Sequence, residues 1–210
     1  MARILITSGP TRQYLDPVRY LSNASSGRMG RALAQAALAR GHAVVVVSGP
    51  VAVRYPAGAE VVPVITTDEM LAACLREFPR CDGVIGVAAP CDYRPVQVED
   101  RKIAKSGGPL LLKLVETPDV VATLGGQKRK HQWIVGFALE TDDHHFRAVT
   151  KLQSKKCDLM VLNRPEAIGA ASSSVEVLDP SGQVVASLAG PKARVAAGIL
   201  ELIDRRLAGG

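Results

Sequence analysis

The sequence predicts an α/β fold built on a mostly parallel sheet, and three observations carry this prediction. Short apolar runs rich in Val and Ile alternate with longer segments of helical composition, which is the order of βαβ units. Only Gly41 and His42 separate the helix predicted at 31–40 from the next run, and such short connections are typical of parallel units. Near the C-terminus, Pro180-Ser181-Gly182 lies between two alternating runs and predicts a β-hairpin.

The first half of the chain contains four predicted strands and two predicted helices. The helix at 31–40 is rich in Ala and Leu, and Gly41 follows it as a C-cap glycine would. Thr66 and Glu69 form a capping box that begins a second helix, which ends near Phe78. Pro63 falls inside a predicted strand and indicates an edge position in the sheet. The strands are predicted at 3–7, 43–48, 60–65 and 82–89.

The second half continues the alternation. Thr117 is the predicted N-cap of a short helix that ends near Leu124. Pro118 occupies the first position of this helix, and Asp119 lies in its first turn. The remaining helices are predicted at 146–156 and 191–207, and the remaining strands at 110–115, 133–138, 158–163, 175–179 and 183–188.

Length and composition favour one folded domain over residues 1–210. Hydrophobic residues make up 47% of the chain, which is enough for a full core. No apolar signal-peptide core follows Met1 and no apolar run reaches membrane-spanning length, so we expect a cytoplasmic protein without a membrane partner. Cysteines at positions 74, 81, 91 and 157 lack C-x-x-C spacing. We therefore predict reduced core thiols and no metal site built on them.

The net charge of +6 favours an anionic partner without identifying it. Aromatic residues are only 4% of the chain and no basic run is interleaved with them, so nucleic acid is not the expected partner.

The stretch from Thr7 to Gly30 connects the first strand to the first helix through small and hydroxylic residues. Backbone N–H groups at such a helix start attract anions, glycines allow close approach, and serines add donors. The loop is too long for a G-x-G-x-x-G turn, and no Lys-Ser or Lys-Thr follows its glycines as in a P-loop. The pattern predicts a phosphate-bearing ligand, with a simple packing turn as the alternative.

A polar segment rich in Gly and Pro, at about 90–109, follows the fourth predicted strand. Long loops at the carboxyl ends of parallel strands are commonly lids or binding loops. Lys102 and Lys105 lie in this segment. We interpret it as a flap whose ammonium groups close over phosphates, with a solvated surface loop as the alternative.

Three further side chains leave two interpretations open. Lys151 and Lys155 lie four residues apart on one helical face, either around an anion or on a solvated surface. Phe137, near the end of a predicted strand, belongs to the core or stacks on a flat ring.

These residues together resemble a known family, bacterial phosphopantothenoylcysteine synthetase (phosphopantothenate–cysteine ligase). The match runs from about Arg3 to Leu207, with the motifs in the family's order. They are Ser8-Gly9-Pro10-Thr11-Arg12, Leu15-Asp16-Pro17-Val18-Arg19-Tyr20, Asn23-x-Ser25-Ser26-Gly27-x-Met29-Gly30, Ala88-Ala89-x-x-Asp92-Tyr93-Arg94, Lys102-Ile103-x-Lys105, Pro118-Asp119, Gly136-Phe137-Ala138-x-Glu140-Thr141 and Asp158-Leu159…Asn163.

The resemblance implies a Rossmann-like fold with helices on both faces of the sheet, a homodimer, Mg²⁺, and CTP as co-substrate. The implied reaction joins 4′-phosphopantothenate to cysteine through an acyl-cytidylate and releases pyrophosphate and CMP, a step of coenzyme A biosynthesis. No protein nucleophile is needed, so the lack of a Ser-His or Cys-His pair is consistent. Bacterial members are often fused to a phosphopantothenoylcysteine decarboxylase, which makes that enzyme a possible partner.

The resemblance also implies the site residues. Asn23 and Lys102 take the catalytic roles, Asn23 at the acyl-phosphate and Lys102 against the charge of departing pyrophosphate. The implied nucleotide-binding residues are Gly9, Ser25, Gly27, Gly30, Asp92, Lys102, Pro118, Asp119, Val120, Val121, Phe137, Lys151 and Lys155. The implied substrate-binding residues are Asn23, Ala88, Ala89, Asp92 and Lys105, and no protein residue is implied as a metal ligand.

The chain departs from the family pattern at two places. One is Pro90-Cys91. The other is Ala104, where a lysine is common in the family, so Lys102 and Lys105 must supply more of the positive charge.

Two other functions stay open on the sequence. An NAD(P)-dependent reductase would need a tight glycine turn and an acid/base pair, and neither is found. A non-catalytic nucleotide-binding module would have no use for a lysine flap.

Overall fold

The computed structural model describes residues 1–139, 144–163 and 172–207. Its centre is an eight-stranded sheet in the order β12-β11-β10-β9-β6-β1-β4-β5. Neighbouring strands pair parallel in the part of the sheet formed by β5, β4, β1, β6, β9 and β10. β11 and β12 form the predicted C-terminal hairpin, and β11 pairs antiparallel with both β10 and β12. The bounds are β1 Arg3–Ser8, β4 Ala43–Ser48, β5 Ala59–Pro63, β6 Gly83–Gly86, β9 Trp133–Leu139, β10 Leu159–Asn163, β11 Ser172–Leu178 and β12 Val184–Pro191.

The chain order of the parallel strands defines the topology. Counted along the sequence, they lie in the order 3-2-1-4-5-6, which is that of doubly wound, Rossmann-type sheets. The order reverses between β1 and β6, which pair from Ile4 with Gly83 to Thr7 with Gly86. A crevice opens beyond the carboxyl ends of the strands at such a reversal, and ligands bind there.

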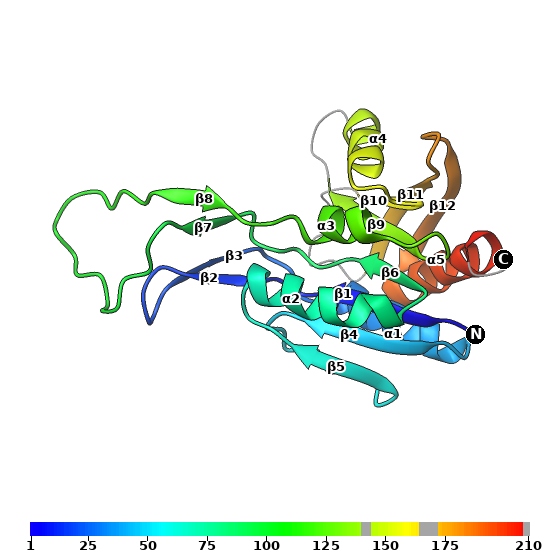
Figure 1. The fold of residues 1–210 in the computed structure, drawn as a ribbon, viewed down its shortest axis with the longest axis horizontal. Coiled ribbons are helices and arrows are strands. Elements are labelled where there is room, and N and C mark those ends of the chain that lie inside the picture. The colour runs from blue at the N-terminus through cyan, green and yellow to red at the C-terminus, as the bar shows by residue number, and fades with distance from the viewer. Residues whose placement is uncertain (140–143, 164–171, 208–210) are drawn as a thin grey trace.

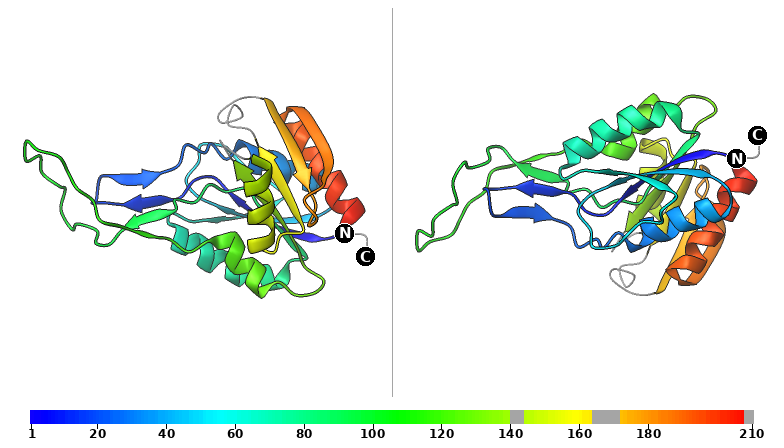
Figure 2. Two further views of the ribbon diagram at one scale, coloured as in Figure 1. Left: turned by 90° about the horizontal axis from the view of Figure 1, so that it is seen from above. Right: turned by 90° about the horizontal axis from the view of Figure 1, so that it is seen from below.

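Helices cover both faces of the sheet, as Figure 2 shows from above and below. One apolar layer contains side chains of α1 (Arg28–Ala39) and α5 (Lys192–Arg206), and the other contains those of α2 (Thr67–Glu77), α3 (Val120–Gln127) and α4 (His144–Ser154). A short 3₁₀ turn, Phe78–Arg80, extends α2. The predicted fold class is confirmed.

Two short antiparallel pairs form an arm that projects from this body. They are β2 (Arg12–Tyr14) with β3 (Tyr20–Ser22), and β7 (Tyr93–Pro95) with β8 (Leu114–Glu116). Figure 1 shows the arm on the left, with residues 96–113 at its tip and the N-terminus at the opposite end of the molecule.

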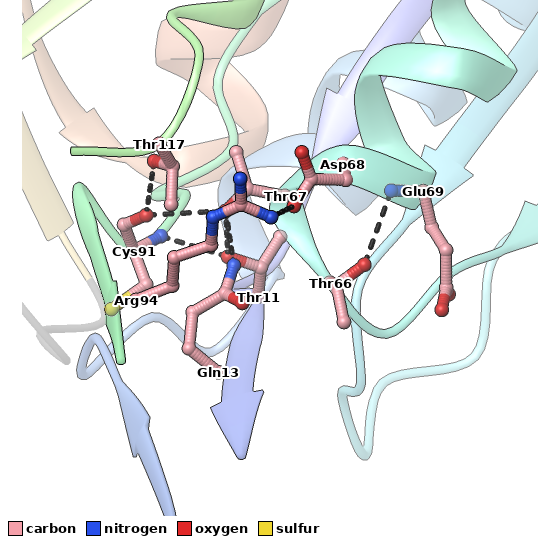
Figure 3. A network of polar contacts seen from close by, with 9 residues as sticks. All are labelled: Thr11, Gln13, Thr66, Thr67, Asp68, Glu69, Cys91, Arg94 and Thr117. Carbon is pink, nitrogen blue, oxygen red and sulfur yellow. Dashed lines mark hydrogen bonds and ion pairs between the residues drawn. The ribbon is translucent and has the colours of Figure 1, made fainter. Parts of the chain in front are cut away.

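A network of threonine hydroxyls fixes the base of the arm to the start of α2 (Figure 3). Thr11 Oγ1 lies 2.8 Å from Thr67 Oγ1 and accepts the backbone N–H of Cys91 at 2.8 Å. The Cys91 carbonyl accepts from Thr67 Oγ1 at 3.2 Å and from Thr117 Oγ1 at 2.7 Å. Thr11 and Thr67 are fully buried. The segment that leaves β6 is therefore held from several sides before it enters the arm.

Several local predictions are confirmed. β5 is an edge strand, as Pro63 indicated. The Thr66 hydroxyl accepts the Glu69 N–H and caps α2. All four cysteines are free and buried. Burial raises the pKa of Cys74 and Cys157 to about 12 and that of Cys81 to about 11, so these thiols stay protonated.

Three local predictions are wrong. The loop from Thr7 to Gly30 contains the β2–β3 hairpin, because residues 12–22 pair with each other in the arm. The strand predicted at 110–115 shrinks to β8 outside the central sheet, and Leu111 is 90% exposed because no core lies beside it. Asp119, not Thr117, caps α3, since Thr117 is bonded to Cys91.

The end of α3 also differs from the prediction. Gly125 and Gly126 lie inside the helix, which ends at Gln127 rather than at Leu124. A Cβ at Gly125 would come within 2.0 Å of the Lys155 carbonyl oxygen. This glycine permits close packing of α3 on the chain after α4 and does not end the helix.

Candidate functional site

A hollow of about 420 Å³ lies where α1 begins and where β6, β9 and β10 end, and we call it the α1 hollow. It occupies the ligand-binding edge of a doubly wound sheet. Its lining residues are Asn23, Ala24, Ser25, Ser26, Gly27, Arg28, Met29, Gly30, Val87, Ala88, Ala89, Phe137, Ala138, Leu139, Asn163 and Lys192.

Asn23 is fixed against the far wall of the α1 hollow. Its amide nitrogen donates to the Pro90 carbonyl at 2.8 Å and to the Ala89 carbonyl at 3.3 Å. Both acceptors lie in the segment that leaves β6, so one side chain joins the start of α1 to the switch point of the sheet. With its nitrogen so engaged, the amide holds a fixed orientation beside the hollow.

Two glycines explain why α1 begins so close to this point. Gly27, the N-cap, has φ 71°, and no side chain caps the helix there. A side chain at Gly27 would meet Val51 at 2.8 Å, and one at Gly30 would meet the Ser8 hydroxyl at 2.0 Å. The helix thus presents its first N–H groups and the positive end of its dipole beside the hollow.

The rest of the α1 hollow combines an apolar wall with polar groups at its edge. Phe137 is partly buried, packs on the α1–α5 core and also lines the hollow, so it belongs to the core, while its stacking on a flat ring stays a prediction. Asn163, at the end of β10, has a buried Oδ1 with no hydrogen-bond partner in the described chain. Arg28 and Lys192 also line the hollow. Sequence reasoning did not single out these two cations, because Arg28 is a variable position of the Asn23–Gly30 motif and Lys192 belongs to no motif.

A second hollow of about 370 Å³, which we call the α3 hollow, lies on the other side of β6. It is lined by Thr7, Ala88, Pro90, Asp92, Tyr93, Glu116, Thr117, Pro118, Asp119, Val120, Val121 and Lys155. Ala88 lines both hollows, and its backbone N–H donates to the Thr7 hydroxyl at 3.3 Å. The two hollows therefore flank one segment of the chain.

An ion pair forms one side of the α3 hollow. Lys155 Nζ lies 2.8 Å from the Asp119 carboxylate, which also accepts the Ala122 N–H at 2.9 Å. Burial raises the pKa of Asp119, but the Ala122 N–H and Lys155 outweigh it, so the pKa lies below its usual value. The anion beside Lys155 in this structure is thus a carboxylate of the chain itself.

Lys102 lies on the arm, away from both hollows, where residues 95–97, 99, 101–103 and 110–113 with Leu15 line a separate depression. Its neighbour Ile103 is clamped by Asp16. Asp16 accepts the Ile103 N–H at 3.1 Å and those of Val18 and Arg19 at 2.8 Å each. Arg19 donates to the Ile103 carbonyl at 2.9 Å. The clamp fixes the stretch of the arm that carries Lys102.

The structure thus brings together most of the predicted site residues, in two groups. Asn23, Ser25, Gly27, Gly30, Ala88, Ala89 and Phe137 line the α1 hollow, and Ala88, Asp92, Pro118, Asp119, Val120, Val121 and Lys155 line the α3 hollow.

Four predicted residues line neither hollow. Lys102 and Lys105 are on the arm, Lys151 is on α4, and Gly9 lies at the end of β1, where its carbonyl accepts the Ala89 N–H at 2.9 Å. Gly9 has φ 74°, so it shapes the backbone next to the α1 hollow.

The described ranges contain no group of three or more His, Cys, Asp or Glu side chains placed to hold a metal ion. None of the helices in those ranges is long and apolar enough to span a bilayer.

A doubly wound sheet with two hollows at its switch point and a helix N-terminus beside them defines the class of Rossmann-like α/β proteins. Residues 1–207 match the sequence profile of the DNA/pantothenate metabolism flavoprotein C-terminal domain. The chain belongs to this family.

Curated relatives agree with the family. The chain is 41% identical over 207 residues to a cysteine/cysteine sulfinic acid decarboxylase of an unknown prokaryotic organism, covering 96% of this chain and 57% of that protein. It is 44% identical over 168 residues to the coenzyme A biosynthesis bifunctional protein CoaBC of Bacillus subtilis (strain 168), covering 80% and 41%. Against CoaBC of Escherichia coli (strain K12), the identity is 44% over 163 residues, covering 76% and 40%. The chain spans about half the length of these relatives.

Solved structures give the same result. The crystal structure of the C-terminal domain of CoaBC has a TM-score of 0.85 and 35% identity, covering 99% of this chain and 96% of that one. A Cab2 variant in complex with phosphopantothenate-cysteine has a TM-score of 0.81, covering 99% and 86%, and at 17% identity it shows the fold alone.

Proposed function

We propose that this chain is a cytoplasmic phosphopantothenate–cysteine ligase of coenzyme A biosynthesis that uses CTP. In the first step, a carboxylate oxygen of 4′-phosphopantothenate attacks the α-phosphorus of CTP. The bond to the β-phosphate breaks, and pyrophosphate leaves. In the second step, the cysteine amine attacks the acyl carbon, the acyl C–O bond breaks, and CMP leaves while the amine loses a proton.

The observation that carries the proposal is the position of Asn23. Its amide is fixed between the start of α1 and the segment leaving β6, beside the hollow into which α1 presents its N-terminus. An acyl phosphate formed there would have helix N–H groups at its phosphate and the Asn23 amide at its acyl end. Such a site works by positioning the reactants and stabilising charge, and it needs no nucleophile of its own.

The residues implied for the nucleotide fall in both hollows. Gly27 and Gly30 are at the α1 hollow, whereas Asp119 and Lys155 are at the α3 hollow, with Ala88 between them. We propose that the phosphates of CTP lie at the α1 N-terminus and that the rest of the nucleotide extends past Ala88.

Mg²⁺ belongs to this proposal as part of the substrate. The described ranges hold no cluster of three acidic or imidazole ligands, whereas Mg²⁺ commonly binds through substrate phosphates and retains several waters. We therefore expect Mg²⁺ to enter with CTP.

A homodimer would bring Lys102 to the site. The arm exposes ten large apolar side chains: Val18, Tyr20, Tyr93, Val96, Val98, Leu110, Leu111, Leu112, Leu114 and Val115. An apolar surface of this kind is typical of a protein interface. We propose that two arms pack together and that Lys102 of the partner subunit reaches the hollows of the body. Association with a decarboxylase is a further proposal, consistent with the bifunctional relatives.

The experiment measures pyrophosphate and CMP release from CTP with Mg²⁺. We expect pyrophosphate release to require 4′-phosphopantothenate, and CMP release to require cysteine as well. With Asn23→Ala, acyl-cytidylate should accumulate while coupling to cysteine stalls. Asn23→Asp is the matched variant, because it keeps the size of the side chain and replaces only the amide nitrogen. Release that depends on neither substrate, or tight NADPH binding in place of CTP, would refute the ligase.

A further inference from the structure

One valine side chain packs against two glycines beside the α1 hollow. Gly9 and Gly27 have φ of 74° and 71°, a backbone conformation that L side chains rarely adopt. A Cβ on Gly9 would lie 2.7 Å from Val51 Cγ1, and a Cβ on Gly27 would lie 2.8 Å from the same methyl carbon. A single methyl group therefore contacts both the residue that follows β1 and the N-cap of α1.

Val51 belongs to the connection between β4 and β5, and we call residues 49–55 the β4 loop. The loop begins against β1, because the Gly49 N–H donates to the Ser8 carbonyl at 3.0 Å. The Gly49 carbonyl oxygen is also among the atoms nearest to a Cβ on Gly9, at 3.2 Å. The start of the loop is thus fixed to the turn that it supports.

Hydroxyl groups hold the other end of the β4 loop. The Tyr55 hydroxyl donates to the Ser8 hydroxyl at 2.8 Å and lies 2.8 Å from the Ser48 hydroxyl oxygen. Ser8 and Ser48 are both buried. A side chain at Gly30 would overlap the Ser8 hydroxyl, so Ser8 also packs against the first turn of α1. Tyr55 is therefore linked to the start of α1 through one buried hydroxyl.

We propose that Val51 and Tyr55 are positioning residues for the binding of phosphate at the α1 hollow. No side chain caps α1 at Gly27, so the placement of its first N–H groups depends on the packing behind them. The β4 loop supplies this packing from outside, since neither Val51 nor Tyr55 is among the described residues that line the hollow. The proposal rests on the proposed function in one respect, namely that the ligand of this hollow carries phosphate.

The binding of phosphate by backbone N–H groups depends on their convergence at hydrogen-bond distance. Without the methyl groups of Val51, Gly9 and Gly27 lose the side chain that packs against both of them. A displacement of about 1 Å at such a site can cost about 10²-fold in rate. The loss should therefore affect the ligand whose phosphate lies at this turn, and it should leave cysteine unaffected.

The first test is the binding of inorganic pyrophosphate, measured by titration calorimetry without any turnover. We expect Val51→Ala to weaken binding about tenfold. Val51→Thr keeps the branched shape and should bind like the wild-type chain, because this position is partly exposed and the new hydroxyl can reach water. Val61→Ala is the matched control, since Val61 is exposed on β5 and is not among the atoms nearest to Gly9 or Gly27.

Three results of this titration would overturn the proposal. They are equal affinities of Val51→Ala and Val61→Ala, a Val51→Thr variant as weak as Val51→Ala, and no binding by the wild-type chain.

Steady-state kinetics separate positioning from a merely structural role. Val51→Ala should raise KM for CTP about tenfold and leave KM for cysteine within about twofold. A rise in KM for 4′-phosphopantothenate instead would assign the phosphate of that substrate to the turn. A loss of folded protein lowers kcat and leaves all KM values unchanged, and that result would overturn the proposal.

Failure of the proposed function would look different. A wild-type chain that forms no product with cysteine refutes the ligase, while the pyrophosphate titration still decides on the β4 loop. If Val51→Ala does not fold, Tyr55→Phe removes only the hydroxyl that Ser8 and Ser48 contact. This variant should weaken pyrophosphate binding about threefold, as the loss of one neutral hydrogen bond would, and unchanged binding overturns the proposal.

Discussion

The body and the arm are held together by different forces. In the body, strands such as β1 and β4 are buried on both faces, and apolar side chains form two continuous layers. In the arm, the strands are three residues long and large apolar side chains face outward. The body has the core it needs to fold alone. The arm has an apolar surface that a partner would cover, and it carries Lys102, which lines neither hollow of the body.

Polar contacts hold the arm where apolar packing does not. Thr11, Thr67 and Cys91 fix its base, and Asp16 clamps its outer part to Ile103. Such buried polar contacts orient a segment in a defined way. We therefore describe the arm as a fixed strut, held at its base and at Ile103, while the closure of residues 90–109 over phosphates stays a prediction.

Removing the tip of the arm should have the largest effect. Val96 and Lys113 already face each other, with the Val96 N–H bonded to the Lys113 carbonyl at 3.0 Å. Replacing residues 97–112 by Asn-Gly would close a two-residue hairpin there. We expect ligase turnover to fall at least about 10³-fold, since Lys102 is lost, and the chain to become monomeric in light scattering. The melting temperature should fall only modestly, because the deletion removes the Asp16–Ile103 contact but no residue of either core layer. A dimer that keeps its turnover would refute the role given to the arm.

Mixing two inactive variants should have the next largest effect. Asn23→Ala removes a body residue and Lys102→Gln an arm residue. If Lys102 acts in the partner's site, a mixed dimer contains one site with both residues intact. Random mixing should then restore about a quarter of wild-type turnover, because half of the dimers are mixed and one of their two sites works. The measurement is product formation after co-refolding, with each variant alone as the control. Absence of recovery would place both residues in the same chain's site.

The body could be predicted from the sequence because its signals are local. The apolar run at 43–48, the capping box at Thr66 and Glu69, and the turn at Pro180-Ser181-Gly182 each specify an element without reference to the rest of the chain. The edge position of β5 followed from a single proline.

The arm could not be predicted in the same way. The run at 110–115 has the apolar composition of a buried strand, yet it lies outside the sheet, because burial there depends on what covers it and not on its own residues. Thr is a residue type that favours N-cap positions, but the Thr117 hydroxyl donates to the carbonyl of Cys91 instead. Cys91 lies 26 residues earlier in the chain, so no local pattern reveals this contact.

The residues of the candidate site likewise divide into those that local motifs predict and those that only the packing of the fold brings together. Residues in ordered motifs, such as Asn23 and Gly27, were found from the sequence and lie together in the α1 hollow. Arg28 and Lys192 were not, because only the packing of α1 beside α5 brings their charges to one place.

A change in the threonine network should have an intermediate effect on stability. Thr67→Val keeps the shape of the side chain but removes the hydroxyl that contacts Thr11, Gln13 and Cys91. We expect a loss of about 1–3 kcal/mol in the free energy of unfolding, measured by urea denaturation, because buried partners are left unsatisfied. Arg94→Gln is the control. Its ion pair with Asp68 is 46% exposed on both sides and should contribute less than about 1 kcal/mol. Equal losses would mean that the buried network does not fix the arm.

The smallest effect should come from the Asp16 clamp. Asp16→Asn keeps an oxygen for the N–H groups of Val18 and Arg19 but places an amide against Ile103. Burial raises the pKa of Asp16. The backbone N–H groups of Ile103, Val18 and Arg19, together with the Arg19 charge, lower it by more, so the pKa lies below its usual value. The clamp therefore stabilises the fold fully above pH of about 4, where the unfolded carboxyl is ionised, and is lost as pH falls through the lower folded pKa.

The amide NMR shift of Ile103 between pH 2 and 6 measures this directly. In the wild-type chain it should titrate with a midpoint below about 3.9, and in Asp16→Asn the step should be absent. At neutral pH the variant should retain its fold and raise KM for CTP only a few-fold, since Lys102 stays on the arm but is held less firmly. A wild-type Ile103 amide that does not titrate would mean that Asp16 does not clamp the arm, and the fixed strut would then depend on the threonine network alone.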